Sequence, residues 1–526
     1  MRSVAPLILV MVAACSASVT DSDTDELLDA YSSSEAVLLD FEFDGEVATS
    51  STWNAESTIN DQLLYTIGHL NGDRSVGRLD AVVLTNVKTT PTGITYHAKL
   101  PVSWGKKSQI PTSYEFILPK NGDGYSAFTT KYMHACVDFG AHEVTSGSMW
   151  YYYRPNNSGC TLDAADVVKH SAKVTVSKLN TTGKYPEYDL VWNDGELDIV
   201  AVFGKYENGA TSGDAGIDGY NAFSNAIAQM LRAKAKTLTT VPANIPPQPG
   251  VANTDVQFNA VLADGKKVNV NILLVDEVSS APASFYTRYE GLSTKADIIM
   301  YNGHAGLGQN VRALSRHGKF VAGKYLIVFM DGCDTFAYVD GSLAETRAAI
   351  NPNDPTGTKL MEIVTNTMPA FFSSMPTASL ALINGLMNYA QPMTYQQMFQ
   401  NLESSQVIVV TGEEDNAFKP GMQPPPPSGS WAGIDEQLTV AKSAEKKFTA
   451  SQVDAGTYVF ELDGTSDADL YVRVGGAPTT RTYTCRPFLG GSKERCEVSL
   501  ASKGDIGVMV RGWAASSSVH LVGRKK

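Results

Sequence analysis

Two reactive side chains follow apolar runs at the same relative position in the chain. Ala296-Asp-Ile-Ile-Met-Tyr-Asn-Gly-His304 ends in an imidazole, and Lys324-Tyr-Leu-Ile-Val-Phe-Met-Asp-Gly-Cys333 ends in a thiol. Their separation of 29 residues is enough for one crossover helix between neighbouring parallel strands. Both side chains would then meet at the carboxyl edge of one sheet, where open α/β sheets bind ligands.

A thiol and an imidazole at this distance could perform nucleophilic catalysis. The thiol needs a base within hydrogen-bond reach to become a thiolate, and an imidazole titrates in the right range. The negative charge that develops on the attacked carbonyl oxygen needs fixed N–H donors. Turns at Gly303, Gly306 and Gly332 can present such donors. We therefore predict His304 as general base and Cys333 as nucleophile.

The pattern of an apolar strand running into a His-Gly turn, then a second strand ending in a small residue and Cys, resembles the caspase, gingipain and legumain superfamily of cysteine peptidases. The resemblance covers 195–418 in outline. It implies peptide-bond hydrolysis by His304 and Cys333, with an oxyanion hole from the Cys333 amide and one near Gly306. One departure is Ala305, where the family usually has Gly. It motivates an alternative, a non-catalytic surface lipoprotein whose decayed peptidase fold acts as a binding module.

Other interpretations of the same segments stay open. Asp331 and Asp334 flank the predicted site and could favour a basic substrate side chain, but either could instead cap a helix or contact solvent. Gly303-His-Ala-Gly-Leu-Gly308 could cradle a phosphate at a helix N-terminus, although Val311 stands where the dinucleotide fingerprint has its third glycine. His317-Gly318 is a second His-Gly pair, but no apolar strand precedes it.

The region that must position His304 and Cys333 alternates between strand and helix patterns. We expect strands near 197–203, 268–275, 296–301, 325–330, 379–383 and 407–410, and helices near 220–238, 358–371 and 395–402. This alternation predicts an α/β domain over 193–418, with a mostly parallel sheet flanked by helices. Together with the resemblance above, it implies a caspase-like fold.

We expect a β-rich α+β domain over 36–192, and its sequence does not indicate a function. Short strand-like runs predict an antiparallel sheet with a helix near Ile59–Leu70, the runs being Ala36–Glu42, Thr95–Val102, Tyr114–Leu118 and Met149–Tyr153. The aromatic run Trp150–Tyr153 could stack on a sugar or a peptide, or be a strand with aromatic rings on both faces.

The C-terminal part begins after a proline-rich linker at 419–430 and turns all-β over 431–526. Ser466-Asp-Ala-Asp-Leu-Tyr-Val472, Cys485-Arg-Pro487, Cys496 and Val508-Met-Val-Arg-Gly-Trp513 resemble the bacterial pre-peptidase C-terminal domain. Such domains are small β-sandwiches appended to secreted peptidases. Asp467 and Asp469 could hold a structural Ca²⁺, or simply lie exposed at the start of a strand.

The cysteines divide into pairs and single residues. Cys485 and Cys496 are spaced for a disulfide in an exported domain. Cys136 and Cys160 could form a second disulfide, or a zinc site with His134 and His142, and an oxidising compartment favours the disulfide. Cys333 then remains unpaired, which marks it as a reactive thiol.

The first residues read as an export signal. Residues 1–14 contain a positive start and a short apolar run, and Val12-Ala13-Ala14-Cys15 resembles the bacterial lipoprotein lipobox. The resemblance implies lipidation of Cys15, and Ser16 after it implies an outer-membrane or cell-surface location in a Gram-negative bacterium. Residues 15–35 would form an acidic tether.

Composition limits the partners. The 526 residues suggest about three domains, and 42 Lys and Arg against 55 Asp and Glu give a net charge of −13. No basic surface is available to neutralise phosphates in bulk, so nucleic acid is not an expected partner. The expected partners are a peptide or protein substrate and a membrane reached through the lipid anchor. No cofactor is required beyond the possible Ca²⁺.

Overall fold

The structure is a computed structural model. It describes residues 31–33, 36–141, 144–181, 183–339, 341–403, 406–413, 416–422, 431, 433–502 and 504–526. Two compact units form, one from Met1–Glu187 and Leu197–Pro420, the other from Tyr188–Glu196 and Gly421–Lys526. Cys15, its lipobox and most of the proline-rich linker lie outside the described residues. Within the described ranges, no helix is long and apolar enough to cross a bilayer.

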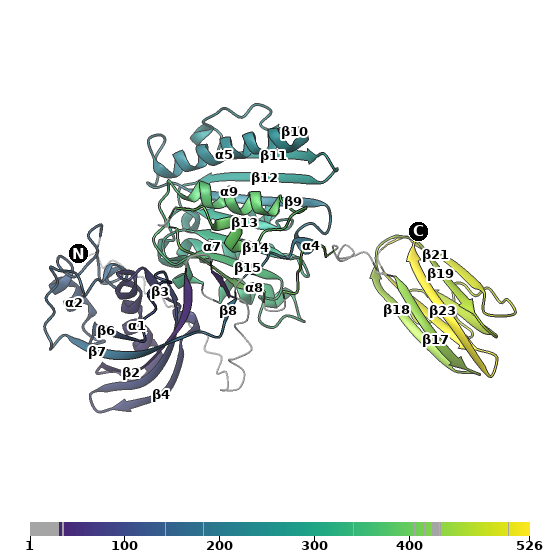
Figure 1. The fold of residues 1–526 in the computed structure, drawn as a ribbon, viewed down its shortest axis with the longest axis horizontal. Helices are drawn as coiled ribbons and strands as arrows, with labels where there is room; N and C mark the ends of the chain where they lie inside the picture. Colours follow the sequence, from purple (N-terminus) through teal and green to yellow (C-terminus); the bar gives the residue numbers. More distant parts are fainter. Residues whose placement is uncertain are drawn as a thin grey trace, which may run out of the picture. The chain divides into compact units, whose positions relative to one another are not determined.

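The first unit is built around a ten-stranded mixed sheet (Figure 1). In spatial order the strands are β10 (Ala235–Val241), β11 (Asp255–Leu262), β12 (Lys267–Val275), β9 (Glu196–Gly204), β13 (Ile298–Asn302), β14 (Leu326–Asp331), β15 (Met361–Asn366), β16 (Ile408–Gly412), β1 (Tyr31–Ser33) and β8 (Asn180–Thr181). The central strands β9, β13, β14 and β15 are parallel. β16 pairs antiparallel with β15, and β10, β11 and β12 form antiparallel pairs.

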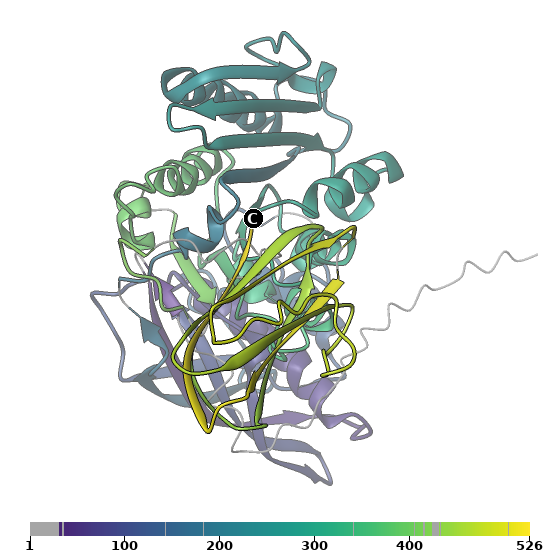
Figure 2. The ribbon, with the colours of Figure 1, turned by 90° about the vertical axis from the view of Figure 1, so that its right-hand side faces the viewer.

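Two groups of helices cover this sheet on opposite faces (Figure 2). One group is α5 (Ala215–Lys234), α9 (Met375–Leu386) and α10 (Tyr395–Phe399), and the other is α6 (Ala283–Ser293), α7 (Gln309–His317) and α8 (Ser342–Ile350). Every residue of β13, β14 and β15 is buried. Strands covered on both faces have no polar side, which explains the continuous apolar runs of β13 and β14.

A second, antiparallel sheet is formed by the N-terminal part of the chain. In spatial order its strands are β3 (Ser75–Gly77), β5 (Gly93–Trp104), β2 (Val37–Ala48), β7 (Val167–Val176) and β6 (Ser113–Pro119). A further strand, β4 (Val83–Thr90), also pairs with β5. The helices are α1 (Ala55–Asn71), α2 (Tyr125–Tyr132) and α3 (Met149–Tyr152). The core of this region continues into Ala305, Phe336 and Tyr338, which follow His304 and Cys333 in the chain.

The second unit contains a β-sandwich and the short helix α4 (Tyr188–Val191). One sheet has the order β17 (Ile434–Ala441), β23 (Ser516–Lys525), β19 (Gly456–Gly464) and β21 (Glu494–Leu500). The other has the order β18 (Glu445–Val453), β22 (Gly504–Gly512) and β20 (Ala468–Val474). Buried apolar residues of both sheets form one core, to which Phe460, Val472 and Val508 belong.

Two predicted elements of the α/β region have the wrong type. The segment 358–371, predicted as a helix, contains β15, and the segment 379–383, predicted as a strand, lies inside α9. Both segments are buried over most of their surface. Neither therefore shows the alternation of polar and apolar residues that distinguishes the 3.6-residue period of a helix from the two-residue period of a strand. Pro376 lies in the first turn of α9, a position where proline favours a helix.

The aromatic run is also not a strand. Met149–Tyr152 is the helical turn α3, and the rings of Trp150 and Tyr153 are buried. Burial of these two rings removes the interpretation of the run as an exposed sugar-stacking platform. The turn packs on α1 at Gly68, where an added Cβ would lie 2.4 Å from the Trp150 carbonyl oxygen. The helical turn therefore depends on a tertiary contact that sequence spacing does not reveal.

We predict that Gly68→Ala destabilises the first unit by about 1–3 kcal/mol or more, since the new methyl group meets backbone atoms that cannot rotate away. Gly291→Ala is the matched control, because Gly291 also lies in a helix and its added Cβ has open space. The control should be neutral or slightly stabilising. Thermal unfolding of both variants measures the difference, and equal melting temperatures would contradict the close approach of α1 and α3.

Candidate functional site

His304 and Cys333 follow the ends of two neighbouring parallel strands. Asn302 of β13 lies opposite Asp331 of β14, so each reactive residue comes two positions beyond a paired residue. The two turns contact each other directly: the Gly303 N–H donates to the Asp331 carbonyl oxygen at 3.2 Å. The structure therefore brings the two turns together at the carboxyl edge of the sheet.

Glycine is needed where these turns touch. A Cβ on Gly332 would lie 2.7 Å from the Gly303 carbonyl oxygen, closer than a side chain can approach backbone. Gly306 has a φ of +60°, in the left-handed region that favours glycine. The Cys333 N–H donates to no acceptor within the described residues. That N–H is consequently available to a ligand at the sheet edge.

The imidazole of His304 is half-buried and held by backbone and aromatic rings. Its Nε2 lies 3.1 Å from the Tyr206 carbonyl oxygen, and its ring centroid lies 5.1 Å from that of Tyr206 and 5.0 Å from that of Phe372. A ring nitrogen that hydrogen-bonds to a carbonyl oxygen must carry the proton. Nδ1 is then the unprotonated nitrogen that can act as a base.

The Cys333 thiol is half-buried, and its Sγ donates to the Ala370 carbonyl oxygen at 3.7 Å. Burial, together with the nearby Asp334 carboxyl, raises the pKa of Cys333 to about 12. In the described part of the chain, no hydrogen bond joins the His304 ring to this thiol. The sulfur is therefore protonated at neutral pH and hydrogen-bonded to backbone.

The two predicted pocket carboxyls are fully buried. Asp331 Oδ1 accepts hydrogen bonds from Asn366 Nδ2 at 2.6 Å and from Gln406 Nε2 at 3.3 Å, while its Oδ2 has no partner. Asp334 has a left-handed φ of 51°, and both of its carboxyl oxygens accept hydrogen bonds. Burial raises the pKa of each carboxyl to about 7. Neither side chain forms an exposed acidic surface.

Sequence reasoning missed the N-terminal residues at this site. Asn71 of α1 donates to Asp334 Oδ1 at 2.5 Å, and the Tyr151 hydroxyl of α3 donates to Asp334 Oδ2 at 2.9 Å. Arg154 donates to the Asn71 side-chain oxygen at 2.8 Å. These residues lie 180 or more positions before Asp334 in the chain. The sequence shows the aromatic run that contains Tyr151, but it does not indicate that the Tyr151 hydroxyl bonds to Asp334.

Both predicted disulfides are present, Cys136–Cys160 and Cys485–Cys496. The zinc interpretation of Cys136 and Cys160 is wrong, because the disulfide consumes both thiolates that would bind the metal. His142, which that interpretation also needed, lies outside the described residues. Cys333 is the free cysteine of the described chain.

The carboxylates suggested for Ca²⁺ have protein partners. Asp469 is buried, and its Oδ2 accepts hydrogen bonds from Arg486 and from the Trp513 indole N–H, both at 2.5 Å. Asp467 Oδ1 accepts from the Gly491 N–H at 3.1 Å. Among the residues that the structure describes, no cluster of three acidic, His or Cys side chains could hold a metal ion.

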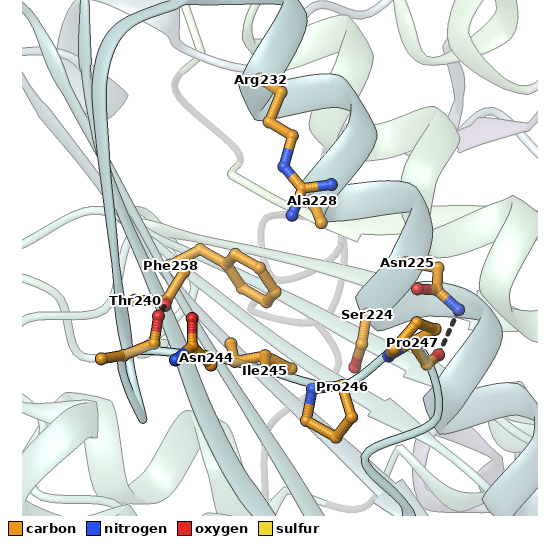
Figure 3. Close-up of a pocket in the computed structure, with 11 residues that line it drawn as sticks. Ser224, Asn225, Ala228, Arg232, Thr240, Asn244, Ile245, Pro246, Pro247 and Phe258 are labelled. Carbon is orange, nitrogen blue, oxygen red and sulfur yellow. Dashed lines mark hydrogen bonds between the residues drawn. The ribbon is translucent and has the colours of Figure 1, made fainter.

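A small cavity of about 170 Å³ lies elsewhere in the first unit, between α5 and the segment 243–247 (Figure 3). Phe258 and Ile245 supply apolar walls, and Arg232 is the charged residue of its lining. The lining includes neither His304 nor Cys333. The lining also includes the polar residues Ser224, Asn225, Thr240 and Asn244, and the buried Ser224 hydroxyl has no hydrogen-bond partner within the described residues.

Comparison with known proteins identifies the C-terminal module. Residues 446–512 match the profile of the bacterial pre-peptidase C-terminal domain. The chain is 35% identical over 101 residues to a zinc metalloprotease of Helicobacter pylori, which is 18% of this chain and 40% of that protein. It is 35% identical over 101 residues to a hemagglutinin/proteinase of Vibrio cholerae, covering 18% of this chain and 17% of that protein. The predicted pre-peptidase C-terminal domain is confirmed. The match spans less than half the length of each of these relatives.

Solved structures were compared as well. The solution structure of vEP C-ter 100 is 37% identical and covers 17% of this chain and 88% of its own, with a TM-score of 0.16. The lysozyme inhibitor PliG of Aeromonas hydrophila is 15% identical and covers 19% of this chain and 89% of its own, also with a TM-score of 0.16. The peptidase and lipoprotein resemblances therefore stay predictions.

The buried Asp331 predicts a dependence of stability on pH. Its pKa is raised from 3.8 to about 7 in the folded chain, so between these values the folded state binds more protons than the unfolded state. Stability contributed by this group is therefore present below pH 4 and is lost as pH rises through 7. The loss is on the order of 1–4 kcal/mol, at about 1.4 kcal/mol per pKa unit.

Asp331→Asn, which mimics the protonated acid, should reduce the fall in melting temperature of the first unit between pH 5 and pH 8. Asp218→Asn, a change at an exposed carboxylate of α5, is the matched control and should leave the fall unchanged. An identical pH profile in Asp331→Asn and the unaltered chain would show that this carboxyl is not protonated in the fold.

Proposed function

We propose that the chain is an exported cysteine endopeptidase in which Cys333 is the nucleophile and His304 the general base. The observation that carries the proposal is the position of both residues, two beyond the paired Asn302 and Asp331 on neighbouring parallel strands. Adjacent turns at the carboxyl edge of a parallel sheet are where such folds bind ligands. The caspase-like resemblance of the sequence points to the same two residues.

The proposed reaction has two steps. His304 Nδ1 takes the thiol proton, and the sulfur attacks the carbonyl carbon of the scissile peptide, forming a C–S bond and a negatively charged oxygen. The free Cys333 N–H donates to that oxygen. The C–N bond then breaks, and the leaving amine takes the proton from the imidazolium. Water attacks the thioester next, releasing the acid and restoring the thiol.

The resting arrangement must change before this reaction begins. The thiol donates to Ala370, and its pKa of about 12 leaves a negligible thiolate fraction at neutral pH. Approach of the Nδ1 atom of His304 would supply the missing base. Hydrogen bonds at catalytic sites are often long without substrate and shorten when it binds. The proposal therefore includes a local movement of the turns that carry the two residues.

The buried Asp331 supports a preference for a basic residue on the acyl side of the scissile bond. Its Oδ2 is buried without a hydrogen-bond partner. A lysine or arginine side chain reaching this oxygen would satisfy it and would favour the carboxylate, because an opposite charge lowers the pKa of a carboxyl. Asp334 is less suited to this role, since both of its oxygens already accept hydrogen bonds.

The C-terminal module supports export and proteolysis. The pre-peptidase C-terminal domain occurs in this chain at 446–512, and the matched relatives are proteases. Two disulfides fit an oxidising compartment. We further propose that Cys15 carries a lipid and anchors the protein in an outer membrane, as the lipobox resemblance implies. Protein substrates would then be met at the cell surface.

A second candidate function is a non-catalytic lipoprotein with a binding role. One observation favours it. The Cys333 thiol has a raised pKa and, within the described residues, no hydrogen bond to the His304 imidazole, as is typical of an inert core cysteine. Ala305 in place of the usual glycine is consistent with it. Labelling with a peptidyl acyloxymethyl ketone separates the two functions, since a catalytic cysteine is modified and an inert one is not.

We predict that Cys333→Ala lowers the rate of peptide cleavage by about 10³-fold or more, because the nucleophile is lost. His304→Gln should lower it by roughly 10²–10⁴-fold through loss of the base. His317→Gln is the control, because His317 stacks on Tyr286 at 3.6 Å and lies on α7. Steady-state kinetics with a fluorogenic peptide measures all three. Undiminished cleavage by Cys333→Ala would end the proposal.

Substrate preference gives an independent measurement. With a panel of peptides that differ on the acyl side, we predict a higher kcat/KM for Arg and Lys than for Leu or Glu. Asp331→Asn should reduce the preference for the basic residues by about 10-fold or more, because a charged substrate group would lose its charged partner. The cleavage rate for Leu peptides should change less, and an unaltered preference would exclude Asp331 from the substrate pocket.

A further inference from the structure

The N-terminal region holds the residue that follows the proposed nucleophile. Both oxygens of Asp334 accept hydrogen bonds from that region, Oδ1 from Asn71 and Oδ2 from the Tyr151 hydroxyl. Arg154 fixes the two donors: it bonds to the Asn71 side chain at 2.8 Å and to the Tyr151 carbonyl oxygen at 3.0 Å. We call Asn71, Tyr151 and Arg154 the clasp.

The clasp is itself rigid. Arg154 is buried and also donates to the Gly68 carbonyl oxygen at 2.7 Å. Gly68 is where α1 and α3 touch, so the guanidinium joins both helices that carry the clasp. A planar group with several bonded donors keeps its neighbours in one geometry. Asp334 is consequently held by a prearranged set of donors.

Apolar contacts extend the same attachment. Ala305 follows His304, and Phe336 and Tyr338 follow Cys333, yet all three belong to the hydrophobic core of the N-terminal region. The Ser103 and Thr367 hydroxyls add a buried hydrogen bond of 2.6 Å between this region and the end of β15. The N-terminal region therefore packs on both turns that carry the proposed catalytic residues.

These contacts bear directly on the thiol. Cys333 is bonded to its neighbour Asp334, whose left-handed backbone is an uncommon conformation for a residue with a side chain. One buried and one partly buried hydrogen bond from the clasp stabilise that conformation. Tyr151 donates to the carboxyl of the residue that directly follows the thiol. With Asp334 in this conformation, the sulfur donates to the Ala370 carbonyl oxygen and, within the described residues, makes no hydrogen bond to the imidazole.

We propose that the N-terminal region is a built-in restraint on the active site, in which the clasp holds Asp334 and so keeps Cys333 in its resting position. This inference rests on the proposed peptidase function for its biological meaning, but the restraint itself is a property of the thiol. Release of the Tyr151–Asp334 contact frees the turn after β14 and lets the sulfur approach His304. The N-terminal region thereby controls when the thiol reacts.

The test measures the reactivity of the thiol in the full chain. Iodoacetamide modification of Cys333, followed by mass spectrometry of the peptide that contains it, reports how often the sulfur leaves its resting position. Tyr151→Phe removes one hydrogen bond to Asp334 and retains the ring, and Asn71→Ala removes the other. Each variant should raise the modification rate about five- to thirtyfold at fixed pH.

The matched control is Tyr96→Phe. It also removes a buried phenolic hydroxyl of the N-terminal region, one that donates to Gln62 and not to Asp334. The control should leave the modification rate within about twofold of the unaltered chain. Near-ultraviolet circular dichroism and thermal melting verify that each variant keeps its fold. Because Tyr151 and Asn71 reach Asp334 from different helices, each variant tests the restraint when the other fails to fold.

The outcomes separate the restraint from the peptidase function. Unchanged modification rates in both clasp variants, or an equal rise in Tyr96→Phe, would overturn the restraint. Slower modification together with lost peptide cleavage would also overturn it and would make the clasp a positioning element. Faster modification without any peptide cleavage would keep the restraint and reject the peptidase. Rapid modification and full cleavage by the unaltered chain would keep the peptidase and reject the restraint.

Discussion

The close contact between the turns after β13 and β14 is the constraint on which the rest of the site depends. A Cβ on Gly332 would lie 2.7 Å from the Gly303 carbonyl oxygen, so no side chain fits at this point. With glycine there, the two strand ends approach until backbone touches backbone, and the residues that follow lie at the same edge. A bulkier residue would separate the turns and, with them, the imidazole from the thiol.

Burial at this edge links the two regions of the first unit. Asp334 is fully buried, and a buried carboxyl is costly unless donors surround it. The donors come from α1 and α3, which belong to the N-terminal region. Removing that region would leave the Asp334 carboxyl without its two hydrogen-bond donors and would expose Phe336. The N-terminal region is thus part of the folded site and not an independent appendage.

Much of this arrangement could be predicted from sequence because it is local. The runs that became β13 and β14 are continuous and apolar, the two disulfide pairs have suitable spacings, and the C-terminal module alternates with period two. Interactions between distant segments could not be predicted. Nothing near Tyr151 in the chain indicates a bond to Asp334. The fully buried β15 and the mostly apolar segment 379–383 of α9 lack the periodicity that distinguishes strand from helix.

The resting geometry also explains how a free thiol can persist beside two disulfides. Oxidation proceeds through the thiolate, and a thiol with a pKa of about 12 contains almost none at neutral pH. Burial and the neighbouring Asp334 both disfavour the charged sulfur. The interactions that make Cys333 a weak nucleophile at rest therefore protect it in an oxidising compartment. In the proposed peptidase, reactivity and protection of this thiol cannot both be maximal in one conformation, so the proposed mechanism requires two.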